Sequence, residues 1–517
     1  MNKSKRLKKS LLVSLIAAVG FFSSCSDLSQ DPYGQQTPEN FYTNAEQVTS
    51  AYVLPYVYMQ SNIYQVHFQV HEFVTDEAVV PARYGYVDQE GQWIRFQRHT
   101  WTSDDNWIEL EWNYLFQAIG YCNQFLSDMD DTDLGNMNLP VNKEQMVAEV
   151  KMVRALHYYW ALSSFGNVPI IEEIGEPSPE TRPSSEVFQF IEREIQDNLL
   201  LLSEKGDPNW YGHFTKSAAR ALLSKLYINA EVFTGTPRWA DAITTIDAVL
   251  NANYSLDASW NDPFRINNQS SDENIFVVPF DANNAQGFNF IQQNLHENIL
   301  FAKYNVDWYG WHKISSQKSF YELYDENDAR INQWVVGPQT YVNENGEEQP
   351  IMNWSGEPMV VTPEINQLVN NEGGEAEGVM NVKYEIQPGG LSNMSNDMVI
   401  FRLADLMLMK AEAIMRQNGG TATQEAVDLV NQVRSRSFDS GAPGAMYTTS
   451  TLTLDELLDE RGRELAYEMH RREDLIRFDK FTDAWWEKDV SEEYRELFPI
   501  PVKQLTANPN LEQNPGY

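Results

Sequence analysis

Apolar residues between positions 219 and 250 recur every three or four residues, and this spacing favours helices over strands. Two such runs flank a Thr-Gly-Thr-Pro turn at 234–237, so they form one helix–turn–helix unit of about the 34-residue tetratricopeptide period. The apolar positions are Ala219, Leu222, Leu223, Leu226, Tyr227 and Ala230, followed by Ala240, Ile243, Ile246, Val249 and Leu250. One unit cannot bury its apolar face alone, so the chain must stack several of them.

Three further helix pairs follow from the same periodicity. They are 145–164 with 185–202, 401–417 with 422–436, and 455–470 with 471–480. The sequence therefore predicts an all-α dominated fold, in which a tetratricopeptide-like helix–turn–helix scaffold occupies residues 145–255 and 401–480.

Two long segments, 74–112 and 256–398, interrupt this pattern. They carry many of the tryptophans, and the second is rich in Asn, Gly and Pro. Long irregular insertions on a rigid scaffold usually carry recognition, so we expect the ligand-binding residues there. The stretch between Arg330 and Lys383 has eight glutamates and no basic residue, which we interpret as a solvated face.

The N-terminus has the layout of an export signal. Basic residues precede an apolar run, Leu11 to Phe22, that is too short to span a bilayer. The run ends in Phe22-Ser23-Ser24-Cys25, which is typical of a bacterial lipoprotein cleavage site. We predict a signal peptide at 1–24, a lipid anchor on Cys25 with a linker to residue 44, and a folded part at 45–517. The alternative is an ordinary cleaved signal peptide with an incidental cysteine.

The chain is strongly acidic, with a formal net charge of −36. The predicted leader holds five basic and no acidic residues, so its removal takes the charge to −41. A polyanion cannot bind nucleic acid by neutralising phosphates, which excludes that class of function. Only Cys122 remains after Cys25, so neither an intramolecular disulfide nor a cysteine-based zinc site can form in the folded part.

Several motifs, taken in order, cover nearly the whole chain. They include Pro38-Glu39-Asn40-Phe41-Tyr42, Phe165-Gly166-Asn167-Val168-Pro169-Ile170, Arg402-Leu403-Ala404-Asp405, Glu460-Arg461-Gly462-Arg463-Glu464-Leu465 and Phe498-Pro499-Ile500-Pro501. In these motifs the chain resembles the SusD/RagB family of outer-membrane glycan-binding lipoproteins. The resemblance implies a lipid-anchored protein on the cell surface. It also implies a partner, a TonB-dependent outer-membrane transporter to which a captured polysaccharide or oligosaccharide is delivered.

The arginines near the C-terminus alternate with acids at helical spacing. They are Arg461, Arg463, Arg471, Arg472 and Arg477, among Glu460, Glu464, Glu468, Glu473 and Asp474. We predict a lattice of ion pairs with a structural role, and each such pair contributes little when exposed.

A glycan binder needs exposed aromatic side chains for the flat faces of sugar rings and polar groups for the hydroxyls. The segment 307–313 offers Trp308, Tyr309 and Trp311 as a platform, with His312 and Lys313 as polar contacts. A glycine-punctuated turn at 83–93 adds Tyr86 and Trp93 to the platform and Asp88 to the polar contacts. The family resemblance implies that these two regions meet. The alternative for each aromatic residue is burial in the core.

Metal and catalytic motifs are weak. The acids Asp128, Asp130, Asp131 and Asp133 lack the glycine and glutamate of an EF-hand, so calcium is an alternative that we do not predict. His67 and His71 lack the glutamate of a zinc-protease helix, and we predict no metal or other cofactor.

No carboxylate pair is marked as catalytic, so we expect no enzyme activity. The strong negative charge favours a neutral glycan such as a glucan over a sulfated or uronic polymer. Two alternatives stay open: a lid or assembly protein for the import of peptides or another nutrient, and a glycoside hydrolase.

Overall fold

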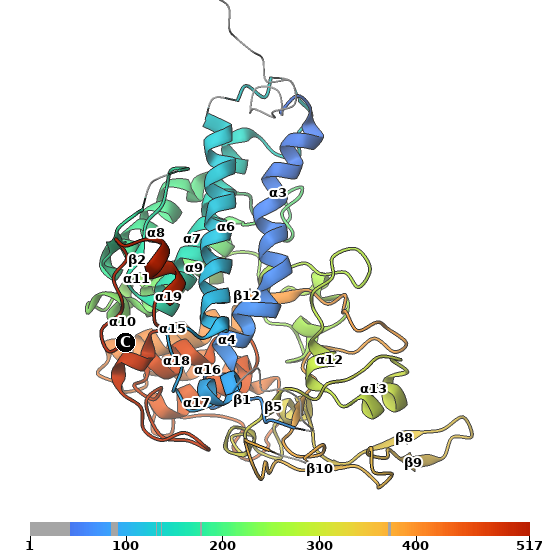
Figure 1. The fold of residues 1–517 in the computed structure, drawn as a ribbon. Coiled ribbons are helices and arrows are strands. Elements are labelled where there is room, and N and C mark those ends of the chain that lie inside the picture. Colours follow the sequence, from blue (N-terminus) through green and yellow to red (C-terminus); the bar gives the residue numbers. More distant parts are fainter. Residues whose placement is uncertain (1–41, 84–90, 131, 136, 176–177, 371–373) are drawn as a thin grey trace, which may run out of the picture.

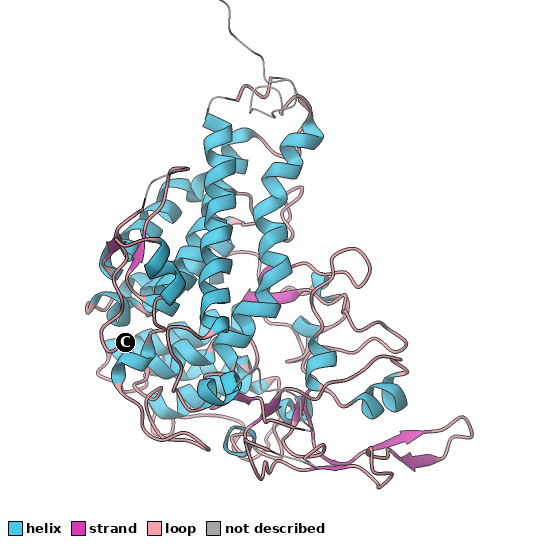
Figure 2. Cartoon of the chain, viewed as in Figure 1, coloured by secondary structure: helices cyan, strands magenta, loops and turns pink. Residues whose placement is uncertain are grey.

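The computed structural model describes residues 42–517 apart from 84–90, 131, 136, 176–177 and 371–373. Helices dominate the regular structure, and the short strands gather mainly at one lower corner (Figures 1 and 2). In the described residues every sheet has only two strands. The prediction of an all-α dominated fold is confirmed.

Seven of the longer helices match predicted ones, whereas the first two in the chain were not predicted, and the second of these begins inside the 74–112 segment that was expected to be irregular. The longer helices are α3 (Ala45–Asn62), α6 (Asn106–Asp130), α7 (Lys143–Phe165), α8 (Ser184–Asn198), α9 (Lys216–Ile228), α11 (Trp239–Leu250), α15 (Leu403–Gln417), α16 (Gln424–Ser435) and α17 (Leu454–Leu465). The shorter ones are α4 (Gln69–Glu72), α5 (Gln92–Gln97), α10 (Ala230–Thr234), α12 (Phe290–Asn294), α13 (Glu297–Tyr304), α14 (Lys318–Tyr321), α18 (Arg471–Arg477) and α19 (Val502–Ala507).

Three scaffold helices begin at a threonine cap. The Thr215, Thr423 and Thr453 hydroxyls accept backbone N–H groups at the starts of α9, α16 and α17. α9 packs against α11, α7 against α8, and α15 against α16, as predicted. Contact between α11 and α15 then joins the two parts of the scaffold across the long insertion.

Some strands pair with distant segments of the chain and others with nearby ones. The pairs are β1 (Ala78–Val79) with β5 (Ser315–Ser316), β2 (Val168–Pro169) with β3 (Thr181–Arg182), β4 (Asn274–Val278) with β12 (Met398–Arg402), β6 (Trp334–Val335) with β11 (Met380–Asn381), β7 (Gly337–Pro338) with β10 (Val360–Val361), and β8 (Thr340–Val342) with β9 (Glu348–Pro350), all antiparallel. β4 and β12 join the two ends of the 256–398 insertion, and the β8–β9 hairpin projects from it (Figure 1).

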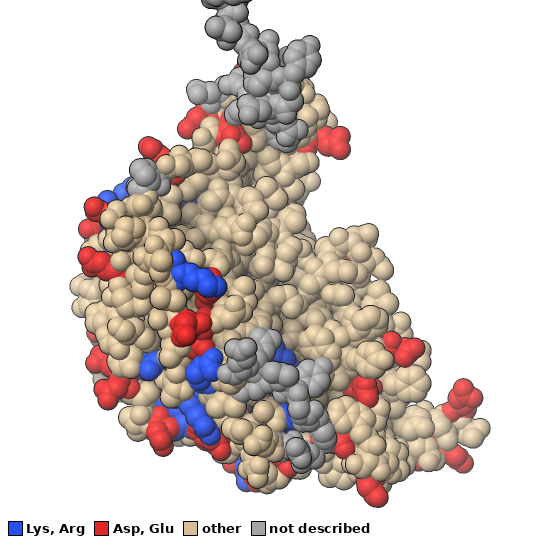
Figure 3. Space-filling model, viewed as in Figure 1, with Lys and Arg blue, Asp and Glu red and all other residues tan. Residues whose placement is uncertain are grey.

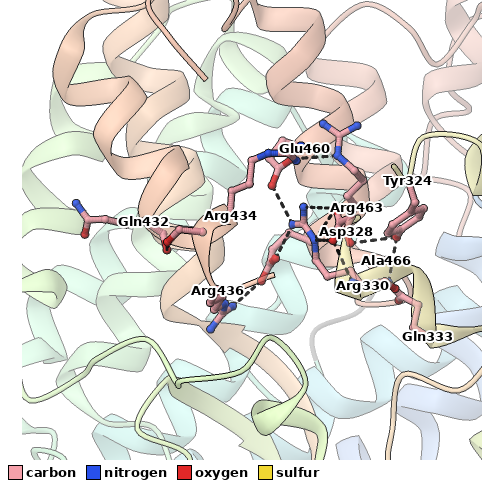
Figure 4. Close-up of polar contacts among 12 residues, drawn as sticks. Tyr324, Asp328, Arg330, Gln333, Gln432, Arg434, Arg436, Glu460, Arg463 and Ala466 are labelled. Atoms are coloured by element: carbon pink, nitrogen blue, oxygen red, sulfur yellow. Dashed lines mark hydrogen bonds and ion pairs between the residues drawn. The ribbon is translucent and has the colours of Figure 1, made fainter. Parts of the chain in front are cut away.

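The C-terminal arginines do form ion pairs, but the pairs are buried rather than exposed. Glu460 accepts hydrogen bonds from Arg330, Arg434 and Arg463 (Figure 4). All four side chains are less than a tenth exposed. The low contribution expected of exposed pairs therefore does not apply to this network, because removing one partner would leave the other charged in a medium that solvates it poorly.

Two further carboxyls bind backbone N–H groups between α17 and α18. Glu77 accepts from Tyr467, and Glu72 accepts from Met469 at 2.6 Å. Tyr467 and Met469 have φ angles of 60° and 64°, a left-handed conformation that side chains with a Cβ rarely adopt. The bend before α18 is thus held by residues from the N-terminal part of the chain.

Candidate functional site

The segment that carries the predicted platform is fixed against the start of α13. The Trp311 N–H donates to Gln292 O at 2.7 Å, and the His312 N–H donates to Leu295 O at 3.1 Å. Gly310 stands in the chain between the exposed aromatic residues and Trp311. It lies so close to the backbone of Leu295 that a Cβ at this position would be 2.4 Å from Leu295 O. Because only glycine permits this approach, the loop can sit on the first turn of α13 while Trp308 and Tyr309 stay exposed.

Four exposed aromatic side chains lie on or beside α13, and we call them the α13 aromatic surface: Phe301 (62% exposed) on the helix, and Trp308 (51%), Tyr309 (73%) and Trp354 (48%) in the neighbouring loops. The Trp354 Nε1 donates to Glu297 Oε1 at 2.6 Å, which ties this ring to the first residue of α13. Its ring also packs on His296, with 4.5 Å between centroids. Trp311 is only partly exposed and forms a β-bridge with His296.

Sequence reasoning missed Trp354 and Phe301 as members of this surface. Trp354 lies in a tight turn, in which the Asn353 N–H donates to Glu357 O at 2.8 Å. The turn has the same signature as 307–311, an aromatic residue beside a glycine among polar neighbours, and could have been recognised. Phe301 had no such signal because its run, Ile299 to Phe301, is apolar like a core helix.

The two predicted regions do meet, as the family resemblance implied. β1 pairs with β5, and the Arg83 guanidinium donates to His312 O at 2.7 Å and to Ser315 Oγ at 2.9 Å. Tyr86 and Asp88 lie outside the described residues, as does Cys25. The structure therefore places the start of the 83–93 turn against the 312–315 segment.

Three of the predicted site residues form the buried junction between these regions instead of a binding surface. Trp93 is 2% exposed and His312 is 3% exposed, so neither can present its ring to a polymer. The Lys313 Nζ lies 4.5 Å from the centre of the Trp93 ring, and burial lowers the pKa of this amine to about 7. These side chains are buried because of a tertiary contact: the pairing of β1 with β5 holds this part of the loop against the rest of the fold.

The surroundings of the α13 aromatic surface are acidic. Glu297 and Asp307 adjoin the aromatic residues, Lys303 in the last turn of α13 supplies one cation, and the sequence from 331 to 382 supplies none. In Figure 3 acidic side chains mark the β8–β9 hairpin, and much of the surface between the hairpin and the α3–α6 pair is uncharged. A neutral ligand would meet no electrostatic barrier here, whereas a polyanion would be repelled.

Other predicted or excluded sites can be placed as well. Asp128 accepts hydrogen bonds from Tyr42 and Gln124, so its carboxylate is engaged within the fold. Trp334 and Trp112 are both buried. Among the described residues no helix has the length and apolar character needed to cross a membrane.

Comparison with known proteins gives a consistent assignment along the chain. Residues 246–517 match the model of the SusD family, and residues 32–228 match one described as starch-binding associating with outer membrane. The starch-binding protein SusD of Bacteroides thetaiotaomicron is 24% identical, over 100% of both chains. SusD-like protein P2 of Formosa agariphila is also 24% identical, over 99% of this chain and 100% of its own.

Solved structures agree on the fold. Surface glycan-binding protein A from Bacteroides thetaiotaomicron, in complex with laminarihexaose, is 19% identical and superposes with a TM-score of 0.71 over 91% of this chain and 100% of its own. B. fragilis NanU is 19% identical, with a TM-score of 0.73 over 94% of this chain and 99% of its own.

Proposed function

Because this chain belongs to the SusD family, we propose that it is a non-catalytic glycan-binding lipoprotein that captures a polysaccharide or oligosaccharide at the α13 aromatic surface. The observation that carries the proposal is the group of four exposed aromatic side chains on and beside one short helix, α13. Large apolar rings are costly to leave in water, and such groups mark interaction sites. Membership of a family that includes starch- and glycan-binding proteins directs the choice of ligand towards carbohydrate.

Charge narrows the ligand class. With a net charge of −36 and acids beside the aromatic rings, the protein favours a neutral glycan, such as a glucan, over sulfated or uronic polymers. Sugar rings would stack on Trp308, Tyr309 and Trp354, and the Glu297 and Asp307 carboxylates would accept hydrogen bonds from hydroxyl groups.

The cellular setting follows from the family and the leader. Lipidation of Cys25 would anchor the protein in the outer membrane, facing the cell surface. A TonB-dependent transporter would be its partner and would receive the bound glycan. Co-purification of that transporter with the lipidated chain tests this part of the proposal separately from ligand binding.

Affinity electrophoresis tests the ligand and the site. Residues 26–517, which lack the predicted leader, are run through gels cast with neutral and anionic polysaccharides. We expect a neutral polymer to retard the wild-type chain. Trp308→Ala with Tyr309→Ala should lose at least tenfold in affinity, or about 1.4 kcal/mol. Trp210→Ala, a change at a partly exposed tryptophan of the helical scaffold, is the matched control and should bind as the wild type does.

The outcomes separate the competing functions. Normal retardation of the double variant would refute the site while leaving the function intact. No retardation by any polymer would point to capture of peptides or another nutrient. New reducing ends after incubation with a bound polymer would indicate a glycoside hydrolase.

A further inference from the structure

Two histidines and one glutamate meet inside the N-terminal helices. The chain continues from α3 through a π-helix, η1 (Ile63–Phe68), into α4, and this segment carries His67 and His71. The His67 Nδ1 lies 2.7 Å from Glu111 Oε1 on α6, and the His71 Nε2 lies 3.5 Å from the same oxygen. The three possible ligand atoms all lie within 4.8 Å of one another, and all three side chains are buried.

We propose that His67, His71 and Glu111 bind one zinc ion, which ties the η1–α4 segment to α6. Two imidazole nitrogens and a carboxylate are a donor set that zinc accepts in proteins. A tetrahedral ion about 2.1 Å from each ligand holds the ligand atoms about 3.4 Å apart. The two distances to Glu111 Oε1, 2.7 and 3.5 Å, bracket this value, and one possible ligand atom of each residue lies within 4.8 Å of the others, so side-chain shifts alone would bring the three atoms to the ion.

An unpaired carboxylate oxygen supports the site independently of the ligand distances. Glu111 is completely buried, and its Oε2 has no hydrogen-bond partner among the described residues. A buried charged oxygen without a partner is costly. A cation beside Glu111 would remove this cost, either through Oε1 alone or by binding both oxygens.

The site also has room for a fourth ligand. A cavity of about 20 Å³ is lined by both histidines and by the polar side chains Tyr159, Lys225, Glu468, His470 and Glu473, whereas Glu111 does not line it. A single water needs about 10–15 Å³ and two or more polar partners. A water in this cavity would lie beside both histidines and supply the fourth ligand, and the burial of all three side chains assigns the ion a structural role rather than a catalytic one.

Local sequence spacing cannot reveal this site. The order His-Phe-Gln-Val-His lacks an internal glutamate, which is why the sequence predicted no metal. The third ligand comes instead from α6, which packs against η1. The competing explanation is a metal-free network, in which His67 bonds to Glu111 and His71 bonds to Ser164 Oγ at 3.0 Å.

Metal content distinguishes the two explanations. Residues 26–517 are produced in zinc-supplemented medium, purified without chelator, and analysed by elemental and native mass spectrometry. We expect one zinc per wild-type chain and none in Glu111→Gln or His71→Asn. His213→Gln is the matched control, because His213 belongs to a different cluster, in which its Nδ1 lies 2.9 Å from Glu149 Oε2 and 3.0 Å from the Tyr52 hydroxyl, and the change should leave the zinc in place.

A second readout uses only the wild-type chain and so does not depend on the folding of the variants. Production with cobalt in place of zinc should give the visible absorption of a tetrahedral cobalt(II) site. Zinc-free wild-type protein that also lacks the cobalt absorption overturns the proposal, as does equal zinc in the wild type and in correctly folded variants. These results are independent of glycan binding.

Discussion

Replacing Glu464 by glutamine should destabilise the protein more than any exposed charge change on the same helix. The Glu464 carboxylate accepts hydrogen bonds from three guanidinium groups: Arg402 at 2.8 Å, Arg436 at 2.6 Å and Arg330 at 2.8 Å. All four side chains are almost wholly removed from water. Glutamine keeps the volume but removes the charge, and its amide would place N–H donors against guanidinium groups.

The magnitude follows from the burial of the network. Breaking a buried ion pair by removing one partner costs about 3–5 kcal/mol, because the remaining charge is left uncompensated. The unfolding entropy of roughly 480 folded residues is about 1 kcal/mol per kelvin. We therefore expect Glu464→Gln to lower Tm by about 3–5 °C.

Differential scanning calorimetry at neutral pH measures this change directly. Glu456→Gln, an exposed position on the same helix, α17, is the control and should change Tm by less than about 1 °C. Circular dichroism confirms that both variants are folded before heating. If Glu464→Gln unfolds within about 1 °C of the wild type, the charges of this network do not hold the C-terminal helices together, and the reasoning fails.

Three further outcomes are expected. Burial alone would raise the pKa of Glu460. The positive charges of Arg330 and the neighbouring arginines exceed this effect and lower the pKa to about 2. Its stabilisation is therefore complete above the unfolded pKa near 4.5, and Tm should fall as pH drops from about 5 to 2, measured by a calorimetric pH series. Gly310→Ala should cost about 1–3 kcal/mol and displace the 307–311 loop, because its Cβ would meet Leu295 O at 2.4 Å; glycan retardation should weaken with it. Cys25→Ser should move the chain from the membrane to the soluble fraction, and an unchanged distribution would refute the lipid anchor.

The scaffold was predictable because its signals are local. The periodicity from 219 to 230 located α9, and the structure moves its start only to Lys216, one residue after the cap Thr215. The capping bond from the Ala218 N–H to the Thr215 hydroxyl is formed within one turn. No distant residue is needed to decide where such a helix begins.

The site was predictable only in part, because exposure depends on distant partners. Trp308 and Tyr309 lie in the irregular segment and are exposed, as a platform requires. Trp93 has the same residue type and a similar glycine nearby, yet it packs in the core with Lys313 against its ring. The difference comes from β1–β5 pairing, which joins segments more than 230 residues apart and leaves no trace in local spacing.

The carboxyls of Glu72 and Glu77 also affect the order in which the protein can be made. Both carboxyls accept hydrogen bonds from backbone N–H groups near residue 468, about 390 positions later in the chain. The N-terminal segment is synthesised first. Its two carboxyls therefore stay without these backbone partners until nearly the whole chain has been made. A C-terminal fragment that starts at residue 246 would include α17 and α18 but would lack the groups that hold the left-handed residues between them. The match to the SusD family model thus marks a region of sequence similarity. The part of the chain that folds cooperatively is larger and includes the N-terminal segment that carries Glu72 and Glu77.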